Sequence, residues 1–178
     1  MDTYFIFNRC PPRFLDPDQK ARRRAGQTEI MEIGYPIAHG KMAQFIAYIG
    51  EVRAGVIATA NREQGPESAY INLAVMPDMA IVFETLITSR KYRNLPRDPR
   101  ASLVIGGKGK TTLQIEGLVD EPTEVLLDDI IQIYYDACPQ NVSHRNWPGI
   151  TYMRLRPRWL RYSDYGMPWK VEEFSFSA

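Results

Sequence analysis

The sequence predicts a mainly β protein whose short antiparallel strands form one barrel-like sheet with flanking helices. Short runs rich in β-branched and aromatic residues recur at 56–60, 69–75 and 80–85, with turn-forming residues between them. Two longer segments instead space their apolar residues at helical intervals. A chain of 178 residues that is 44% hydrophobic can bury one sizeable core and is short for two, so we expect one domain.

The first 35 residues or so do not fit a packed core. They hold a proline pair at 11–12 and an arginine run at 22–24, which break any periodic pattern. We expect an extension at 1–35, partly disordered, ahead of a single domain at 36–178.

The first regular element is expected to be a helix from Gly40 to Ile49. Its apolar residues fall on one helical face, which would cap the barrel; these are Met42, Phe45, Ile46 and Ile49. The three strands named above follow this helix and read as an antiparallel meander.

The middle of the chain alternates between strand and helix signals. A short helix is expected at 90–95, then a strand at 101–105 and another at 111–119. The glycine-rich stretch 106–110 joins these strands as a hairpin loop. It lacks the spacing and the following Ser/Thr-bearing helix of a P-loop, so it does not predict a nucleotide site.

The last third predicts a second helix at 122–137, a polar loop at 139–149 and closing strands at 150–162 and 169–176. The loop carries His144, which we interpret as an ordinary loop histidine rather than a catalytic group.

The segment 81–95 carries the strongest functional signal. An apolar strand ends near Thr85, and Ser89, Arg90 and Lys91 then open the short helix. The first N–H groups of a helix lack hydrogen-bond partners within the helix, and Ser89 is a suitable N-cap residue. Arg90 and Lys91 would add charge-assisted hydrogen bonds to a phosphate. The pattern fits a phosphate site and also a capped surface helix with solvated cations, and the local residues alone do not favour the phosphate site.

Composition limits the other function classes. Lys plus Arg number 22 against 21 Asp plus Glu, which argues against nucleic acid or an anionic membrane as the main partner. Cys10 and Cys138 are the two cysteines, and without a spaced Cys/His cluster they predict neither a metal site nor a disulfide framework. The chain shows no apolar run of about 20 residues and no apolar signal core, so we expect a cytoplasmic protein.

The order T-x-x-x-S-R-K-Y-R-N-L at 85–95, followed by P-R-D-P-R-A-S-L at 96–103, resembles the signature of the pyridoxamine 5′-phosphate oxidase-like family of FMN-binding split barrels. Further segments at 55–60, 65–69, 113–117 and 156–165 resemble other strands of that family, in the same order. The likeness extends from about residue 36 to residue 174.

Two departures separate the chain from true pyridoxamine 5′-phosphate oxidases. The stretch 69–74 lacks the arginine and the lysine that contact FMN in those enzymes, and residues 164–168 replace their R-x-H-D-R substrate signature. The chain therefore resembles the smaller general stress protein-like members, and oxidation of a vitamin B6 phosphate is not expected.

The resemblance implies a six-stranded antiparallel Greek-key split barrel that works as a homodimer, with FMN in two grooves at the subunit interface. Residues matching the FMN phosphate segment are Thr85, Ser89, Arg90 and Lys91. By the same resemblance, Thr112 and Gln114 lie on the strand that passes near the flavin ring and ribityl chain. Tyr162, or its neighbour Trp159, lies near the position at which some family members offer an aromatic side chain from the opposite subunit.

These expectations lead to a redox flavoprotein that takes a hydride from a reduced nicotinamide, NADH or NADPH, and passes electrons to a small molecule. The cofactor would perform the chemistry, so no catalytic side chain and no metal is assigned. Three alternatives stay open: a non-catalytic flavin- or haem-binding protein, a reductase that uses the deazaflavin F420, and a cofactor-free dimer.

Overall fold

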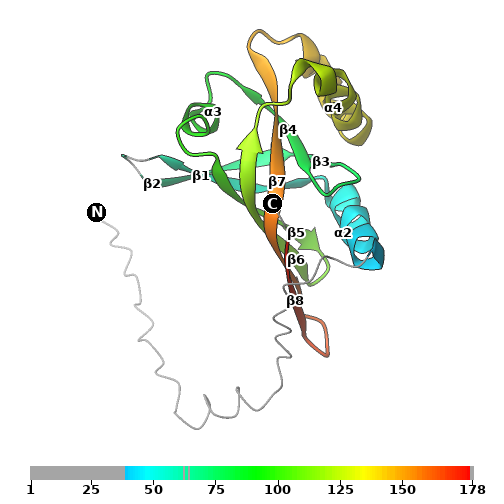
Figure 1. Cartoon of the computed structure of the whole chain (residues 1–178). Coiled ribbons are helices and arrows are strands. Elements are labelled where there is room, and N and C mark those ends of the chain that lie inside the picture. The colour runs from blue at the N-terminus through cyan, green and yellow to red at the C-terminus, as the bar shows by residue number, and fades with distance from the viewer. Residues whose placement is uncertain (1–38, 62, 64, 177–178) are drawn as a thin grey trace, which may run out of the picture.

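The computed structural model describes residues 39–61, 63 and 65–176, so the extension expected at 1–35 lies outside the described residues. Along the chain the elements are α2 (His39–Val52), β1 (Ala54–Asn61), β2 (Gly65–Asn72), β3 (Ala74–Val75), β4 (Ile81–Leu86), α3 (Arg90–Asn94), β5 (Arg100–Lys108), β6 (Thr111–Asp120), α4 (Glu124–Ala137), the 3-10 helix η1 (Pro139–Asn146), β7 (Ile150–Asp164) and β8 (Lys170–Ser175). Figure 1 shows their arrangement.

The strands form one curled antiparallel sheet in the order β2-β1-β5-β6-β7-β4-β3, with β8 added beside β7. The sheet curls far enough that β2 and β4, which are not hydrogen-bonded neighbours, come into contact. This half-barrel confirms the predicted mainly β split-barrel class. We call the junction of β2 and β4 the seam.

The sheet has eight strands, so the expectation of six strands was wrong. The stretch predicted as one strand at 69–75 divides at Leu73, whose N–H donates to the Arg53 carbonyl at 3.0 Å instead of to a neighbouring strand. As a result β2 pairs with β1, while β3 pairs with β4. At the other end of the chain, β8 extends the sheet beyond β7.

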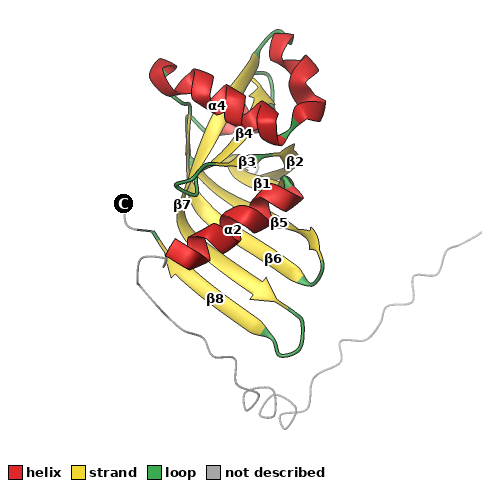
Figure 2. Ribbon diagram, turned by 90° about the vertical axis from the view of Figure 1, so that its right-hand side faces the viewer, coloured by secondary structure: helices red, strands yellow, loops and turns green. Residues whose placement is uncertain are grey.

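The helix α2 closes the main core. Figure 2 shows it crossing one face of the sheet. Phe45 and Ile49 are fully buried, as the helical spacing predicts, and each contributes roughly 1.5–3 kcal/mol through loss of its apolar surface from water. Strand alternation supplies the opposing side chains, with Ile57 and Leu103 facing inward as direct cross-strand partners.

A second, smaller core lies where α4 packs against β4 and β7. Its buried side chains include Ile130, Tyr134 and Tyr135 of α4 with Val82 and Tyr152 of the sheet. The segment 139–149, predicted as a loop, is in large part the 3-10 helix η1, because Pro139 suits a first helical turn. No helix in the described ranges is long and apolar enough to cross a membrane.

The pairing of β6 with β7 contains a bulge at Glu116 and Gly117. A Cβ atom at Gly117 would lie 2.1 Å from the Arg156 carbonyl oxygen, so only glycine allows the two backbones to approach this closely. Bulges increase the local twist of a sheet, and this one helps the sheet curl toward the seam.

Candidate anion site at the seam

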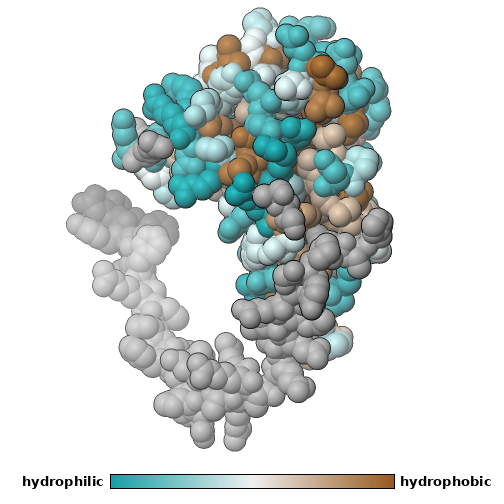
Figure 3. Space-filling model, viewed as in Figure 1, coloured by the Kyte–Doolittle hydropathy of each residue, from teal (hydrophilic) through white to brown (hydrophobic). Residues whose placement is uncertain are grey.

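The segment after β4 brings polar side chains to the seam. Helix α3 follows β4 and contacts β1 and β2. Between them lies a cavity of about 160 Å³, which we call the seam cavity. Its walls are Thr59, Glu67, Ser68, Ser89, Arg90 and Lys91, with Ala69. The space-filling view shows a mainly hydrophilic surface over α3 (Figure 3).

Two hydroxyl groups connect β4 to the start of α3. The Ser89 hydroxyl accepts a hydrogen bond from the Tyr92 backbone N–H at 3.3 Å, which confirms its prediction as the N-cap. The Thr85 and Ser89 hydroxyls lie 2.9 Å apart and share a hydrogen bond, and Thr85 is buried. Because α3 has five residues, its dipole is small, and any anion here depends on the side chains.

Arg90 and Lys91 supply the positive charge of the seam cavity. The Arg90 side chain is 66% exposed, and one of its terminal nitrogens lies 3.2 Å from a Glu67 carboxylate oxygen. Lys91 is partly buried, and the resulting loss of water lowers the pKa of its ammonium group. An anion beside Lys91 would replace that lost solvation, so the ammonium group favours a negatively charged ligand.

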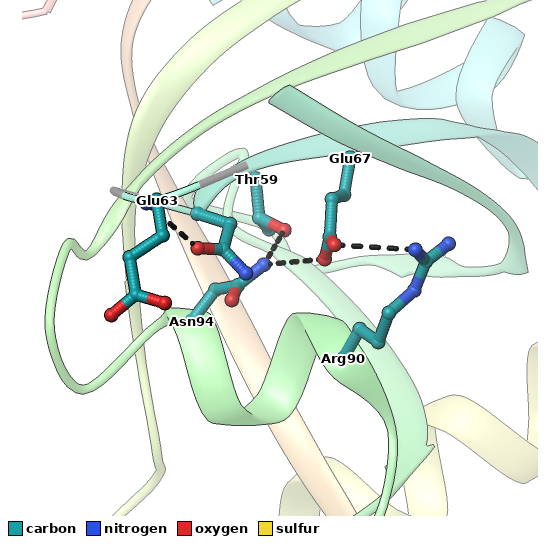
Figure 4. Close-up of polar contacts among 6 residues, drawn as sticks. Thr59, Glu63, Glu67, Arg90 and Asn94 are labelled. Carbon is teal, nitrogen blue, oxygen red and sulfur yellow. Dashed lines mark hydrogen bonds and ion pairs between the residues drawn. The ribbon is translucent and has the colours of Figure 1, made fainter. Parts of the chain in front are cut away.

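Glu67 lines the seam cavity and was not among the site residues expected from the sequence. One carboxylate oxygen accepts from the Asn94 amide at 2.9 Å, and the same amide donates to the Thr59 hydroxyl at 3.1 Å (Figure 4). The carboxylate thus holds both Arg90 and Asn94 at the cavity wall. Its inward position follows from the strict alternation of exposed and partly buried residues along β2, which was the available signal.

A larger hollow lies on the outer face of the sheet, and we call it the outer groove. It has a volume of about 580 Å³, and its walls include Val56, Tyr70, Val104 and three glycines. Tyr70 pairs with Val56, Val56 with Val104, and Val104 with Gln114, so these four side chains form a row on one face.

The sequence-predicted residues Thr112 and Gln114 border the outer groove. They lie two positions apart on β6, and therefore face the same side of the sheet. Thr112 pairs with Gly106, which lines the groove. Trp159 faces the same side on β7, whereas Tyr162 is buried and its ring packs 5.6 Å from that of Phe45. The structure therefore does not bring Tyr162 to the groove.

A separate polar cluster lies near η1. A Glu84 carboxylate oxygen lies 2.6 Å from Nδ1 of His144, whose ring packs 4.0 Å from that of Trp147. The other Glu84 oxygen accepts from the Tyr135 hydroxyl at 3.3 Å, and that hydroxyl lies 2.7 Å from the one on Tyr152. The carboxylate fixes the imidazole orientation and leaves Nε2 available, which is more than the sequence analysis expected of His144.

Comparison with known proteins identifies the family. Residues 39–164 match the family model described as pyridoxamine 5′-phosphate oxidase. The chain belongs to this family. The match confirms the resemblance inferred from the motif at 85–103. Comparison with curated proteins gives no match.

Solved structures of low sequence identity share the fold. A heme binding protein from Mycobacterium smegmatis aligns with a TM-score of 0.66 at 19% identity, over 79% of this chain and 59% of that one. General stress protein 26 from Bacillus anthracis aligns with a TM-score of 0.52 at 19% identity, over 67% of this chain and 93% of that one. The heme storage protein HutZ from Vibrio cholerae aligns with a TM-score of 0.56 at 13% identity, over 65% of this chain and 88% of that one. The chain thus spans 59% of the length of the Mycobacterium smegmatis protein.

In this member of the pyridoxamine 5′-phosphate oxidase family, β2 carries no positive charge. The stretch 69–74 has no cation, and the cavity side of β2 instead carries the carboxylate of Glu67. The seam cavity of this family member is consequently less positive than its Arg90 and Lys91 alone would make it.

Proposed function

We propose that the protein is an FMN-binding flavoprotein with oxidoreductase activity. FMN combines a doubly charged phosphate, a polar chain and a flat, largely apolar ring, and the chain offers a matching succession of surfaces. The observation that carries the proposal is that both hollows border the edge strand β2. Ser68 lines the seam cavity, and Tyr70 lines the outer groove two residues later on the same strand face, about 7 Å away by strand rise.

The phosphate would be held by Ser89, Arg90 and Lys91. Arg90 uses one nitrogen for Glu67 and has further N–H donors for phosphate oxygens, because a guanidinium carries five. Lys91 supplies a mobile point charge with reduced solvation. Thr85 would orient the Ser89 hydroxyl rather than touch the ligand, since it is buried behind Ser89.

The ring would lie over the apolar floor of the outer groove, with Thr112 and Gln114 at its border. The Gln114 amide can donate or accept a hydrogen bond at a ring edge. When bound, FMN supplies the redox chemistry, accepting a hydride from a reduced nicotinamide and passing two electrons to a small-molecule acceptor. The side chains bind and orient the flavin and limit water at the groove floor.

We propose that the outer groove is completed by a second copy of this chain. Tyr70 is 72% exposed, and Val56 and Val104 are each 43% exposed, which leaves an apolar row on the outer face. A homodimer would cover this row and enclose the ring, and Trp159 of each copy faces the same side. Light scattering of the purified protein tests this homodimer. The Tyr70→Asp variant is expected to be a monomer. A monomeric wild type would contradict the proposed homodimer.

The function is tested by the small molecule that the purified protein carries. We expect a flavin absorption spectrum and FMN in the mass spectrum of the denatured extract. Arg90→Ala with Lys91→Ala should abolish FMN retention, while the far-UV circular dichroism stays unchanged. The matched control, Arg145→Ala with Arg158→Ala, removes two exposed cations elsewhere and should retain FMN. Undiminished flavin in the first variant would refute the phosphate assignment.

Haem binding is a second candidate, favoured by the Glu84–His144 pair and by the similar fold of the Mycobacterium smegmatis heme binding protein and of HutZ. A histidine whose Nδ1 is held by a carboxylate presents Nε2 as a basic iron ligand. His144→Ala would remove a haem absorption band and leave FMN retention unchanged. The deazaflavin F420 would use the same seam cavity as FMN, and the mass of the released molecule separates the two.

A further inference from the structure

A second polar cavity adjoins the seam cavity beside α3. Its volume is about 360 Å³, and we call it the arginine cavity. Its walls are Asn61, Glu67, Arg90, Arg93, Asn94 and Arg97. Glu67 and Arg90 line both cavities, so the two hollows are contiguous through this ion pair.

The three arginines reach one cavity because of the local backbone. Arg90 and Arg93 are three residues apart on α3, and therefore lie on one helical face. The chain continues in a turn in which the Arg97 N–H donates to the Asn94 carbonyl at 3.0 Å, which keeps Arg97 on the same side. All three are exposed residues.

The charge balance of the arginine cavity favours an anionic occupant. Its walls contribute three guanidinium groups and a single carboxylate, Glu67. Like charges this close on one helical face destabilise each other, and an anion among them relieves the repulsion. Guanidinium groups also match the planar oxygen pairs of phosphate and carboxylate groups.

We propose that the arginine cavity binds the second anionic group of a ligand whose first phosphate lies in the seam cavity. The location of that first phosphate rests on the function proposed above. FMN has one phosphate and leaves the arginine cavity unused. A flavin dinucleotide carries a second phosphate directly after the first, and F420 carries carboxylates beyond its phosphate. The arginine cavity therefore adds affinity for a flavin-type ligand with an anionic extension, while FMN binds through the seam cavity alone.

Glu67 has a definite role in this arrangement. Its two oxygens hold Arg90 and Asn94, the two side chains at the boundary between the cavities. The carboxylate keeps Arg90 at the point where the two anionic groups of one ligand would meet, so a single guanidinium can contact both.

The first test uses inorganic diphosphate and inorganic phosphate, measured by isothermal titration calorimetry. Diphosphate should bind the wild type at least roughly tenfold more tightly, the size of one additional charge-assisted hydrogen bond. Arg93→Gln with Arg97→Gln should remove that difference. The control pair Arg145→Gln with Arg158→Gln should keep it. Equal affinities in the wild type, or an unchanged preference in Arg93→Gln with Arg97→Gln, would overturn the proposal.

The second test compares FMN, FAD and F420. Tighter binding of FAD identifies a second phosphate as the preferred group, and tighter binding of F420 identifies a carboxylate. In either case Arg93→Gln with Arg97→Gln should weaken the preferred cofactor about tenfold and change FMN affinity less than twofold. If FMN matches or exceeds both, the arginine cavity has no such role. If FMN does not bind the wild type at all, the proposed function fails, and the diphosphate comparison still decides the arginine cavity.

Discussion

Glu67→Gln should strengthen the binding of ligands that carry a single phosphate, such as FMN, which do not need Arg90 at the boundary of the two cavities. The substitution removes one negative charge from the wall of the seam cavity and keeps the length and shape of the side chain. Its carbonyl oxygen can still accept from the Asn94 amide, which now donates to the carboxylate at 2.9 Å. Arg90 loses its charged partner and becomes free to turn fully toward the ligand.

The size of the effect follows from the dimensions of the cavity. A hollow of 160 Å³ corresponds to a sphere of radius about 3.4 Å, so a central anion would lie about 5 Å from the Glu67 oxygens. The repulsion between two unit charges at that distance is about 3 kcal/mol at an effective dielectric constant of 20 and about 0.8 kcal/mol in water. Because the cavity opens to solvent, we expect about 1–2 kcal/mol, or roughly 5- to 30-fold in affinity.

The cost in folding stability should be small. Arg90 is 66% exposed, so its ion pair with Glu67 contributes about 0–1 kcal/mol after solvent screening. Chemical denaturation of the variant should therefore give a free energy of unfolding within about 1 kcal/mol of the wild type.

The assay is the dissociation constant for FMN and for inorganic phosphate, measured at two salt concentrations. Glu63→Gln is the matched control, because Glu63 is an exposed acid in the turn between β1 and β2 and its carboxylate points away from Glu67 (Figure 4). The control should bind like the wild type. Unchanged or weaker binding in a folded Glu67→Gln variant would refute the assignment of the phosphate to the seam cavity.

Two further predictions concern stability. Gly117→Ala should lower the free energy of unfolding by at least about 1–3 kcal/mol in urea denaturation, because its Cβ would collide with the Arg156 carbonyl oxygen. Gly50→Ala, in helix α2 with no atom within 4 Å of its Cβ, should instead stabilise by about 0.5–1 kcal/mol, and equal effects would argue against the bulge geometry. Burial raises the pKa of three tyrosine hydroxyls, at Tyr134, Tyr135 and Tyr152. Their stabilising contribution is complete below about pH 10 and is lost at higher pH, where the unfolded chain ionises first, by about 1.4 kcal/mol per pH unit for each group. Urea denaturation between pH 8 and 11 should show this decline and Tyr152→Phe a shallower one; a flat profile would contradict it.

Local sequence patterns predicted the helices and strands well, but they did not predict contacts between residues that are distant in the sequence. The spacing of Phe45 and Ile49 located α2, and the hydroxyl of Ser89 located the start of α3, because both depend on neighbouring residues. Glu67 escaped because its partners, Arg90 and Asn94, come together with it only when the sheet curls.

The same limitation explains the two other differences. His144 looked like a loop residue because Glu84, its partner, lies 60 residues earlier in the chain. Tyr162 was assigned to the ligand by resemblance, and its actual side of the strand depends on the register of β7 with β6, where a bulge shifts the pairing. Alternation along β7 alone does not reveal such a shift.

The alternation of side chains on β1 and β2 separates residues that would contact a ligand from residues that form the core. Val56, Ser68 and Tyr70 face outward at the proposed ligand surface, while Ile57 and Ile71 on the same two strands face the core. Over the outer groove, every second residue can therefore be substituted without disturbing the core packing, whereas the seam cavity also uses Thr59 and Glu67 on the inward side. This division makes the barrel a suitable scaffold for directed evolution, in which the outward positions are randomised and the inward ones are held constant.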